Sequence, residues 1–414
     1  MKTSTIACVM WTVLAMAAGR ASATDWPQWR GPENNGITRE THFSIQAIAT
    51  PKVLWKANVG AGYSAVAVAG GRAFTAGWAD GKDHIRCLDA ATGKELWTHS
   101  YASPKFDKFH PGGTGSTPTI HDGRVYYASK QGDLFCLDAG SGKVQWHKVL
   151  TRDLGASVPT WGFSGSPIVE GQAVIVDAGV IAAFDRRSGK EIWRSEAMPA
   201  GYSTPVAFDH DGRRLVAAFT GETLVVLNAA DGKIIARFPW KTQYDVNAAT
   251  PIVSGDRIFI SSGYGRGAAL LRLNGSTLEK VWENTEMKNQ MNPSVLIDGL
   301  LYGFDGNTRQ PQARLACVEF DTGKARWGQP GLGAGALIAA VPKDSPGDAH
   351  LIAMSERGEL VLVAADPSGY KELARSQVLG GTCWTVPVVS NGRIYCRNDR
   401  GDLVCLDAKA EETR

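Results

Sequence analysis

The sequence lacks the features that mark several large classes of protein. Its 44 Lys and Arg residues and 41 Asp and Glu residues leave a net charge of +3. A charge this close to balance argues against a nucleic-acid platform or a polybasic membrane surface, because either needs a concentrated basic field. No apolar run reaches the roughly 20 residues that a membrane-spanning helix requires. We therefore expect no nucleic-acid partner and no transmembrane segment.

Motifs for several kinds of chemistry are also missing. None of the seven cysteines stands in a C-x-x-C or Cys-Cys pair, which argues against zinc, thioredoxin and c-type haem sites. The eight histidines form no H-x-x-x-H or H-E-x-x-H pattern, so zinc-hydrolase chemistry has no support. Residues 162–166 approach the G-x-S-x-G motif of a nucleophilic serine but end in Ser166. We expect neither catalytic residues nor a metal site.

The chain is instead rich in glycine and tryptophan. It contains 47 Gly and 13 Trp among 414 residues, more than ordinary usage. Many tight turns and many aromatic packing sites are therefore expected. Hydrophobic residues make up 43% of the chain and charged residues 21%, so the chain can bury a core.

The first residues have the three parts of a secretory signal peptide. Lys2 precedes an apolar run at 6–18, and small residues follow at 21–23. The apolar run is too short to span a membrane, so the pattern predicts a signal peptide at 1–23 that is cleaved after Ala23. We therefore expect an exported protein, periplasmic or secreted.

One motif recurs along the rest of the chain at intervals of about 45 residues. Clear copies are CLDAATGKELW at 87–97, CLDAGSGKVQW at 136–146, AFDRRSGKEIW at 183–193 and CVEFDTGKARW at 317–327. Degenerate copies begin at residues 226, 272 and 363, and the half-copy CLDA at 405–408 ends the series. The chain therefore contains eight repeat units.

Each unit has the pattern of a four-stranded antiparallel meander. Asp122-Gly123 and Asn391-Gly392 stand between apolar runs, and such dipeptides are strong hairpin signals because type I′ turns need positive φ. The D-x-x-T-G-K string fits a further hairpin with a glycine bulge. Four strands in about 45 residues match the blade of a β-propeller. We predict an all-β fold, an eight-bladed β-propeller of four-stranded antiparallel blades.

The ring of blades must also close. The last unit stops at Asp407 without a fourth strand or a tryptophan, whereas an unmatched strand, PKVLWKANVG, precedes the first unit. We predict that this N-terminal strand completes the last blade and that Trp55 supplies the missing tryptophan, which removes two exposed sheet edges. The layout is then an extended strap at 24–50, the propeller at 51–408 and a tail at 409–414.

Tryptophan and cysteine occupy fixed positions in the repeat. The motif tryptophans should lie on the outermost strands and pack between neighbouring blades: Trp97, Trp146, Trp193, Trp282 and Trp327. The cysteines of the CLDA strings should be small buried hydrophobes, with a Cys396–Cys405 disulfide as the alternative for Cys405. In the strap, Trp26 and Trp29 should lie in a groove between blades, or else form a docking peptide for a partner.

These repeated A-x-D-x-x-T-G-K-x-x-W strings resemble the tryptophan-docking repeats of the pyrroloquinoline-quinone (PQQ) type propellers, over about residues 51–408. The segment DWPQWRGPENNGIT at 25–38 is similar to the leader of exported bacterial PQQ-like repeat proteins. The resemblance implies one of two functions. Quinoprotein alcohol dehydrogenases are eight-bladed enzymes that hold PQQ and calcium on the axis, whereas the outer-membrane barrel-assembly propeller of the BamB type is a non-enzymatic adaptor.

Two long connections from an outer strand to the next inner strand, at 101–115 and 151–165, should reach the mouth of the central channel. Candidate ligand- or partner-binding residues on such loops are His110, Trp161, Tyr202, Tyr244, Asp245, Asn247, Gln290, Asn292 and Trp384. A ring of polar and aromatic side chains could grip a planar cofactor, a sugar or a peptide. The alternative is that the aromatic residues plug the channel and the polar residues cap loop backbones.

A PQQ site would need basic partners for three carboxylates and oxygen ligands for calcium. Arg152, Arg266 and Arg309 could be the basic partners, and Asp153, Asp245 or Asn247 the oxygen ligands. The dehydrogenases of the family carry a disulfide between adjacent cysteines and longer insertions, and this sequence has neither.

The sequence therefore favours an exported, non-catalytic binding or scaffold module with no required cofactor. Its partner would be a protein or another component of the cell envelope. A PQQ-dependent oxidoreductase with calcium is one alternative, and a carbohydrate or cell-surface binding protein is another. The repeat signature describes blade packing, which determines the fold and leaves the function open.

Overall fold

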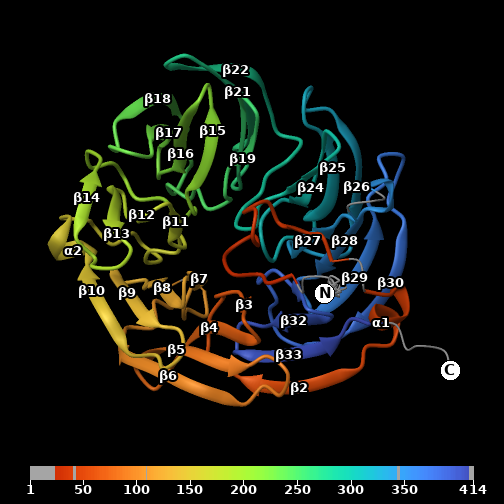
Figure 1. The fold of residues 1–414 in the computed structure, drawn as a ribbon. Coiled ribbons are helices and arrows are strands. Elements are labelled where there is room, and N and C mark those ends of the chain that lie inside the picture. Colours follow the sequence, from red (N-terminus) through yellow and green to blue (C-terminus); the bar gives the residue numbers. More distant parts are fainter. Residues whose placement is uncertain (1–23, 41–42, 109, 343–345, 410–414) are drawn as a thin grey trace, which may run out of the picture.

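The computed structural model describes residues 24–40, 43–108, 110–342 and 346–409. Within these ranges the chain forms eight β-sheets around one axis (Figure 1). Each blade contains four antiparallel strands in the order of the sequence, except that the last blade takes one strand from the N-terminal region, and one sheet gains a fifth, parallel strand. The predicted eight-bladed propeller is confirmed. The predicted signal peptide at 1–23 and the tail residues 410–414 lie outside the described residues.

The first four blades contain sixteen strands, and the first-named strand of each blade lies nearest the axis (Figure 1). Blade 1 is β3 (Ala67–Ala69), β4 (Arg72–Ala79), β5 (Lys82–Asp89) and β6 (Glu95–Ala102). Blade 2 is β7 (Thr119–His121), β8 (Arg124–Ala128), β9 (Asp133–Asp138) and β10 (Val144–Val149). Blade 3 is β11 (Ile168–Glu170), β12 (Ala173–Asp177), β13 (Ile181–Asp185) and β14 (Glu191–Arg194). Blade 4 is β15 (Val206–His210), β16 (Arg213–Phe219), β17 (Thr223–Asn228) and β18 (Ile234–Pro239).

The other four blades repeat this order. Blade 5 is β19 (Ile252–Ser254), β20 (Arg257–Ser262), β21 (Gly267–Asn274) and β22 (Thr277–Asn284). Blade 6 is β23 (Val295–Ile297), β24 (Leu300–Asp305), β25 (Arg314–Glu319) and β26 (Ala325–Pro330). Blade 7 is β27 (Ala336–Ala340), β28 (His350–Met354), β29 (Glu359–Ala364) and β30 (Glu372–Gln377), with β1 (Ile37–Thr38) added parallel to β27. Blade 8 is β31 (Val388–Ser390), β32 (Arg393–Arg397), β33 (Asp402–Asp407) and β2 (Val53–Asn58).

Helical structure in the described residues is short. The helices are α1 (Ile45–Ala49), α2 (Leu150–Asp153) and the 3-10 helix η1 (Pro346–Asp348). No helix in the described part of the chain is long and apolar enough to cross a membrane.

Strand β2 closes the ring, as predicted. It pairs antiparallel with β33, and Trp55 stands opposite Cys405. A second contact links blades 8 and 1, because the buried guanidinium of Arg397 donates to the carbonyls of Gly60, Ser64 and Ala76 over 2.6 to 2.9 Å. The two ends of the propeller are therefore joined both by a strand and by a buried hydrogen-bond cluster.

The motif tryptophans lie on the outermost strands and dock each blade onto the next. Each indole Nε1 donates a hydrogen bond of 2.8 to 3.2 Å to a backbone carbonyl of the following blade. The donors are Trp55, Trp97, Trp146, Trp193, Trp282 and Trp327, and the carbonyls belong to Ala90, Ala139, Arg186, Ala229, Phe320 and Asp366. Most of these rings also lie against the positive-φ glycine of the D-x-x-T-G-K turn: Gly93, Gly142, Gly189, Gly232 and Gly323. The repeat thus encodes one contact at the seam between neighbouring blades, in which a tryptophan packs on the turn of the following blade, and this contact recurs around the ring.

A matched pair of glycines tests this contact. Gly232 and Gly212 have φ values of +70° and +69°, so an alanine costs about 1 kcal/mol or more at either position through backbone strain alone. A Cβ on Gly232 would overlap the Trp193 ring, whereas the space around Gly212 is open. We expect Gly232→Ala to lower the free energy of unfolding by a further 1–3 kcal/mol or so, because its methyl group overpacks the seam. Urea unfolding measures this difference. Equal losses for the two variants would contradict the seam contact.

Helix α1 replaces the tryptophan that blade 7 lacks. The position opposite Leu362 on β30, where six of the other seven blades have tryptophan, is Ala374. Ile48 of α1 is fully buried in the same apolar cluster as Ala374. The backbone N–H of Ser44, which caps this helix, donates to the carbonyl of Ala408 in blade 8 over 3.0 Å. The N-terminal segment therefore supplies both the bulk and the hydrogen bond of the absent indole.

The six cysteines in the described residues are buried and free. This agrees with their predicted role as small hydrophobes. The alternative disulfide is wrong for a geometric reason. Cys405 stands opposite Tyr395 and Cys396 opposite Val404, so the two cysteine side chains point to opposite faces of the sheet.

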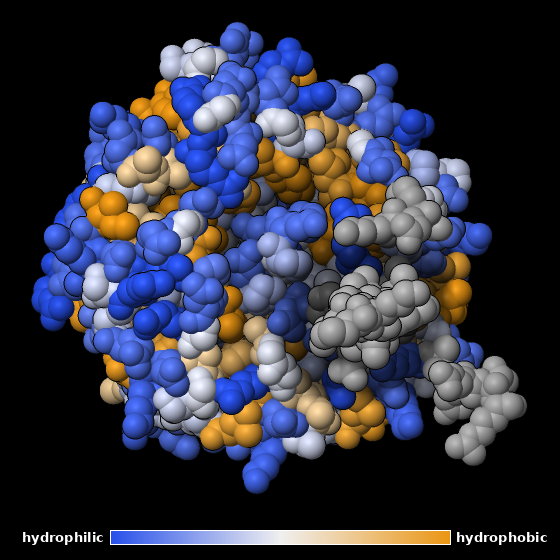
Figure 2. All heavy atoms as spheres, viewed as in Figure 1, coloured by the Kyte–Doolittle hydropathy of each residue, from blue (hydrophilic) through white to orange (hydrophobic). Residues whose placement is uncertain are grey.

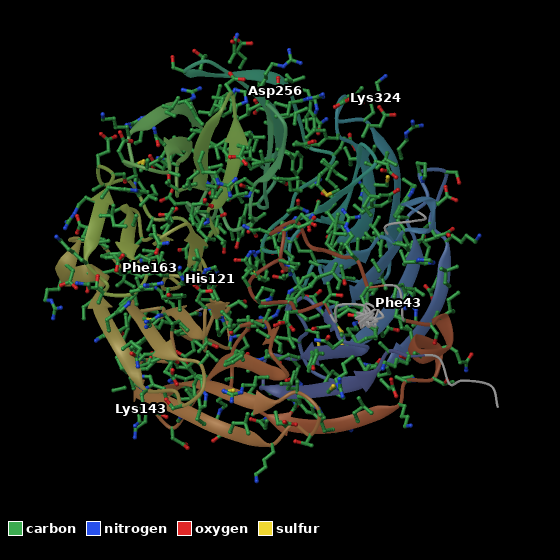
Figure 3. The ribbon with its side chains drawn as sticks, viewed as in Figure 1. Phe43, His121, Lys143, Phe163, Asp256 and Lys324 are labelled. Atoms are coloured by element: carbon green, nitrogen blue, oxygen red, sulfur yellow. The ribbon has the colours of Figure 1, made fainter. Side chains whose placement is uncertain are left out.

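The lysines that follow the turn glycines lie at the outer rim. Lys143 and Lys324 are exposed and project outward from the ring (Figure 3). Hydrophilic side chains dominate the rim in the view of Figure 2, and apolar atoms show in separate patches. These two lysines are therefore solvated charges of the turns.

The strap does not lie in a groove between two blades, which corrects our expectation. It crosses the middle of the ring (red in Figure 1) and bonds to the inner strands of several blades. Trp26 exchanges two backbone hydrogen bonds of 2.8 Å with Val68 of blade 1, and the carbonyl of Pro27 accepts from Ile120 of blade 2. The guanidinium of Arg30 donates to Ser294 beside blade 6. The path of the strap is therefore determined by backbone N–H and C=O groups at the axial edges of the inner strands, with which it forms hydrogen bonds.

Candidate functional site

A cavity of about 740 Å³ lies on the axis, at the start of the inner strands. Seven of the nine candidate residues predicted from the sequence line it: His110, Trp161, Tyr202, Tyr244, Gln290, Asn292 and Trp384. Arg309 also lines it. The structure therefore brings together residues from six different connections between strands, and the two long loops reach the axis as expected.

The floor and the wall of the cavity are held by hydroxyl groups. Trp29 of the strap lines the cavity, and its indole Nε1 donates to Thr250 Oγ1 over 2.9 Å. Neighbouring inner strands are linked because the backbone N–H of Thr117 donates to Ser166 Oγ and that of Ser166 donates to Thr204 Oγ1, both over 2.9 Å. These links explain why Ser and Thr precede the inner strands, and they make the cavity wall rigid.

One side of the cavity is an aromatic and basic wall. Tyr63 stacks on Trp384 with ring centroids 5.3 Å apart, and the guanidinium of Arg309 lies 5.2 Å from the centre of the Trp384 ring. Glu356 Oε1 accepts from the indole of Trp384 over 2.9 Å and from the backbone N–H of Arg309 over 2.8 Å. The carboxylate of Glu356 thus fixes this wall from behind, and it is not among the residues that line the cavity.

Lys130 continues this wall toward blade 2. Its residue surface is only 4% exposed, and it lines the cavity. Burial lowers the pKa of Lys130 to about 8, and the charge of Asp83 opposes this shift. Burial, followed by the charges of Lys130 and Arg309, lowers the pKa of His110 to about 4. At neutral pH His110 is therefore uncharged, with its Nδ1 accepting the N–H of Gly112 over 2.9 Å.

The other side of the cavity holds two aromatic pairs. Trp161 and Tyr202 have ring centroids 5.7 Å apart at an interplanar angle of 60°. Tyr244 and Tyr264 meet edge to face at 5.1 Å and 79°. Gln290 donates to the hydroxyl of Tyr264 over 2.9 Å. The rings thus face the cavity at several angles and form a bowl.

Two predicted site residues lie elsewhere. Asn247 is fully buried, and its amide donates to the carbonyls of Thr220, Gly221 and Trp240 while accepting from Ser262. All of its hydrogen-bonding capacity therefore holds loops together. Asp245 is exposed beside Tyr244, at a positive φ of 55°, and does not line the cavity.

Three of the other residues considered for a quinone site, Arg152, Asp153 and Arg266, do not line the cavity. Arg152 pairs with Asp153 over 2.8 Å. Arg266 pairs with Glu283 over 2.7 Å and lies over the ring of Trp240. Arg309 alone of the three arginines lines the cavity.

Sequence reasoning missed Lys130, although the repeat contained a signal. The turn before the third strand of a blade is SKQGDL at 129–134, SERGEL at 355–360 and NDRGDL at 398–403. Glu356 and Asp399 occupy the second position of the latter two copies, and both carboxylates accept backbone N–H groups. Lysine cannot accept such bonds. A basic residue at a position that is acidic in related copies therefore marked a change of role.

The fold and this cavity define a class of protein, an eight-bladed propeller with a cavity on its axis. The family model described as outer membrane protein assembly factor BamB matches residues 41–104 and 81–329. The chain therefore belongs to this family of PQQ-like, BamB-type β-propellers.

Individual relatives of two kinds are found. The chain is 26% identical over 198 residues to the outer membrane protein assembly factor BamB of Burkholderia pseudomallei (strain K96243), over 46% of this chain and 47% of that protein. It is 31% identical over 137 residues to the dehydrogenase subunit of the alcohol dehydrogenase (quinone) of Gluconacetobacter polyoxogenes, over 30% of this chain and 18% of that protein. The chain thus spans about half the length of the first relative and less of the second.

A solved structure agrees in fold. The crystal structure of BamB from Moraxella catarrhalis has a TM-score of 0.61 and 16% sequence identity, over 88% of this chain and 99% of that chain. At this identity the likeness shows the fold alone.

The cavity fits PQQ with calcium only in part. Lys130 and Arg309 could hold carboxylates of the quinone, and the aromatic rings could contact its body. Calcium takes six to eight oxygen ligands and prefers carboxylates. None of the described residues that line the cavity is Asp or Glu, and the described residues contain no group of three or more His, Cys, Asp or Glu placed to hold a metal ion. The donor set therefore does not fit the calcium half of such a site.

Proposed function

We propose that the protein is an exported, non-catalytic binding propeller that serves as a scaffold for assembly in the cell envelope. The observation that carries this proposal is the chemistry of the axial cavity, which is aromatic, polar and basic and has no carboxylate among its described lining residues. Aromatic and arginine side chains are typical anchors of binding interfaces. A carboxylate base or a hard-metal site would need groups that this lining does not offer.

The family supports the same role. The model that matches most of the chain is described as an outer membrane protein assembly factor. The predicted signal peptide at 1–23 supports export, and a protein or another envelope component is the proposed partner. The rim of the cavity offers a contact surface, because Tyr244 is 50% exposed there.

An assay of quinone chemistry tests the non-catalytic part of the proposal. The purified protein would be incubated with PQQ and calcium, desalted, and examined for quinone absorbance and for dye reduction with alcohols and aldose sugars. We expect no calcium-dependent retention and no turnover, while a quinone-dependent alcohol dehydrogenase treated in parallel shows both. Retention that needs calcium, together with dye reduction, would replace the scaffold with a PQQ-dependent oxidoreductase.

A further inference from the structure

We propose that the axial cavity binds an anionic sugar, with the carboxylate or sulfate of the ligand held by Lys130 and Arg309. This proposal rests on the same cavity as the function proposed above, and a titration with free sugars tests it separately from any protein partner. Four features of the cavity support it.

The first feature is a buried cation without a partner. The ammonium of Lys130 makes no hydrogen bond or ion pair with the described residues, although its residue is 4% exposed and lines the cavity. Asp83 acts on its charge from nearby but is not within ion-pair distance, and the Asp83 carboxylate is engaged by the hydroxyl of Tyr101 over 3.0 Å. A buried charge is costly unless it is paired. A ligand anion in the cavity would supply the missing partner.

The second feature is that Lys130 has no structural duty that explains its charge. At the matching turn position of blades 7 and 8, the carboxylates of Glu356 and Asp399 accept the backbone N–H groups of Arg309 and Thr382, which lie in connections that precede these turns. In blade 2 it is the backbone of Lys130 that contacts the following loop, because its carbonyl accepts the N–H of Phe163 over 2.9 Å, as the carbonyl of Glu356 accepts that of Cys383 over 3.0 Å. The fold would be served by many side chains at this position, so the ammonium group is free for a ligand.

The third feature is a second cation on the same wall. The guanidinium of Arg309 forms no ion pair with the described residues and lies over the face of Trp384, 5.2 Å from its centre. His110 is influenced by the charges of both Lys130 and Arg309, which places the two cations around one part of the cavity. With no Asp or Glu among the described lining residues, an anion there meets attraction from two groups and no opposing carboxylate.

The fourth feature is the arrangement of the rings, which distinguishes a sugar from a flat aromatic acid. The pairs Trp161 with Tyr202 and Tyr244 with Tyr264 are tilted by 60° and 79°. Tyr63 and Trp384 are stacked, but on each other. These pairs form no parallel-walled slot for a planar ligand. Rings at several angles, with the amides of Gln243 and Gln310 beside them, suit a puckered ring that presents C–H faces and hydroxyl groups.

The size of the cavity agrees with such a ligand. Its volume of about 740 Å³ is within the usual range of roughly 300–1,000 Å³ for small-molecule sites. The site is therefore assigned to an acidic mono- or disaccharide unit, free or at the end of a longer glycan.

Calorimetric titration of the full-length mature protein tests the assignment. The probes are lactose, lactose 3′-sulfate, digalacturonic acid and PQQ without calcium. We expect at least one acidic sugar to bind about tenfold or more tightly than lactose, equivalent to about 1.4 kcal/mol, and the preferred probe identifies a sulfate or a carboxylate. Equal binding of lactose and both acidic sugars, tighter binding of PQQ, or no binding of any sugar would overturn the proposal.

Three variants locate the charge. Lys130→Met keeps the length of the buried side-chain stem. It should weaken binding of the acidic sugar about tenfold or more while leaving the affinity for lactose unchanged. Arg309→Gln changes an exposed side chain, so we expect the variant to fold as wild type does. It should weaken binding of the same acidic sugar. Lys241→Met is the matched control, because Lys241 lies near the cavity loops but pairs with Glu222 over 2.6 Å and does not line the cavity. Unchanged binding in both Lys130→Met and Arg309→Gln, or an equal loss in Lys241→Met, would contradict the assignment.

Discussion

Replacing residues 51–58 with a Gly/Ser linker of equal length is expected to destabilise the whole ring and to promote association between molecules. This segment contains β2, which supplies the outermost strand of blade 8 and the tryptophan that docks blade 8 onto blade 1. Loss of a buried tryptophan side chain alone costs roughly 3–5 kcal/mol, and the ladder to β33 is lost with it. The linker keeps the strap attached, so the effect reports on β2 itself.

The measurement is a thermal melt of the linker variant beside wild type, with light scattering to detect association. An unpaired β33 and an unfilled seam at blade 1 leave two open edges, which invite pairing with other chains. Leu54→Ala is the control, because Leu54 is on the same strand but points outward and is 38% exposed. It should melt within a few degrees of wild type. A linker variant that melts like Leu54→Ala and stays monomeric would contradict the closure of the ring by β2.

The fold could be predicted because the sequence contains eight copies of one blade motif. Most copies carry a turn string that places a glycine against the tryptophan of the preceding blade, so local sequence and tertiary contact agree. Trp55 could be assigned to the last blade because one tryptophan was missing there and one was left over. The signal for blade 7 was weaker, since Ala374 stands at the tryptophan position and helix α1 fills the seam.

The path of the strap could not be predicted, because it depends on groups that exist only once the ring has formed. Trp26 bonds to Val68 and Pro27 to Ile120, and these backbone groups are free only at the axial edges of the inner strands. Composition indicated that the strap tryptophans would be buried, and they are largely so. It carried no information on which surface would bury them.

The candidate site could be predicted in outline. Loops after the outermost strands must meet around the channel, so His110, Trp161 and Trp384 were found from topology. Asn247 was placed among them for the same reason, yet its amide group donates hydrogen bonds to three carbonyls of neighbouring loops and is not available to a ligand. Lys130 escaped notice because it stands in a short turn inside a blade, and only the comparison of repeat copies reveals its unusual charge.

We propose that the protein meets its partner at the cavity face and not at the outer rim. Tyr244 stands at the cavity and is 50% exposed, whereas Ile192 stands on the outermost strand of blade 3 and is 49% exposed. The two positions therefore offer the same accessibility to a probe. They differ in the face of the ring that they report on.

The most direct measurement places the photo-crosslinking residue p-benzoylphenylalanine at position 244 or 192 of the full chain, expressed in its native cells. After irradiation, adducts are isolated through the protein and identified by mass spectrometry. The account predicts a defined adduct with an envelope protein from position 244 and only background from position 192. Equal adducts at both positions, an adduct from position 192 alone, or none from either would contradict it.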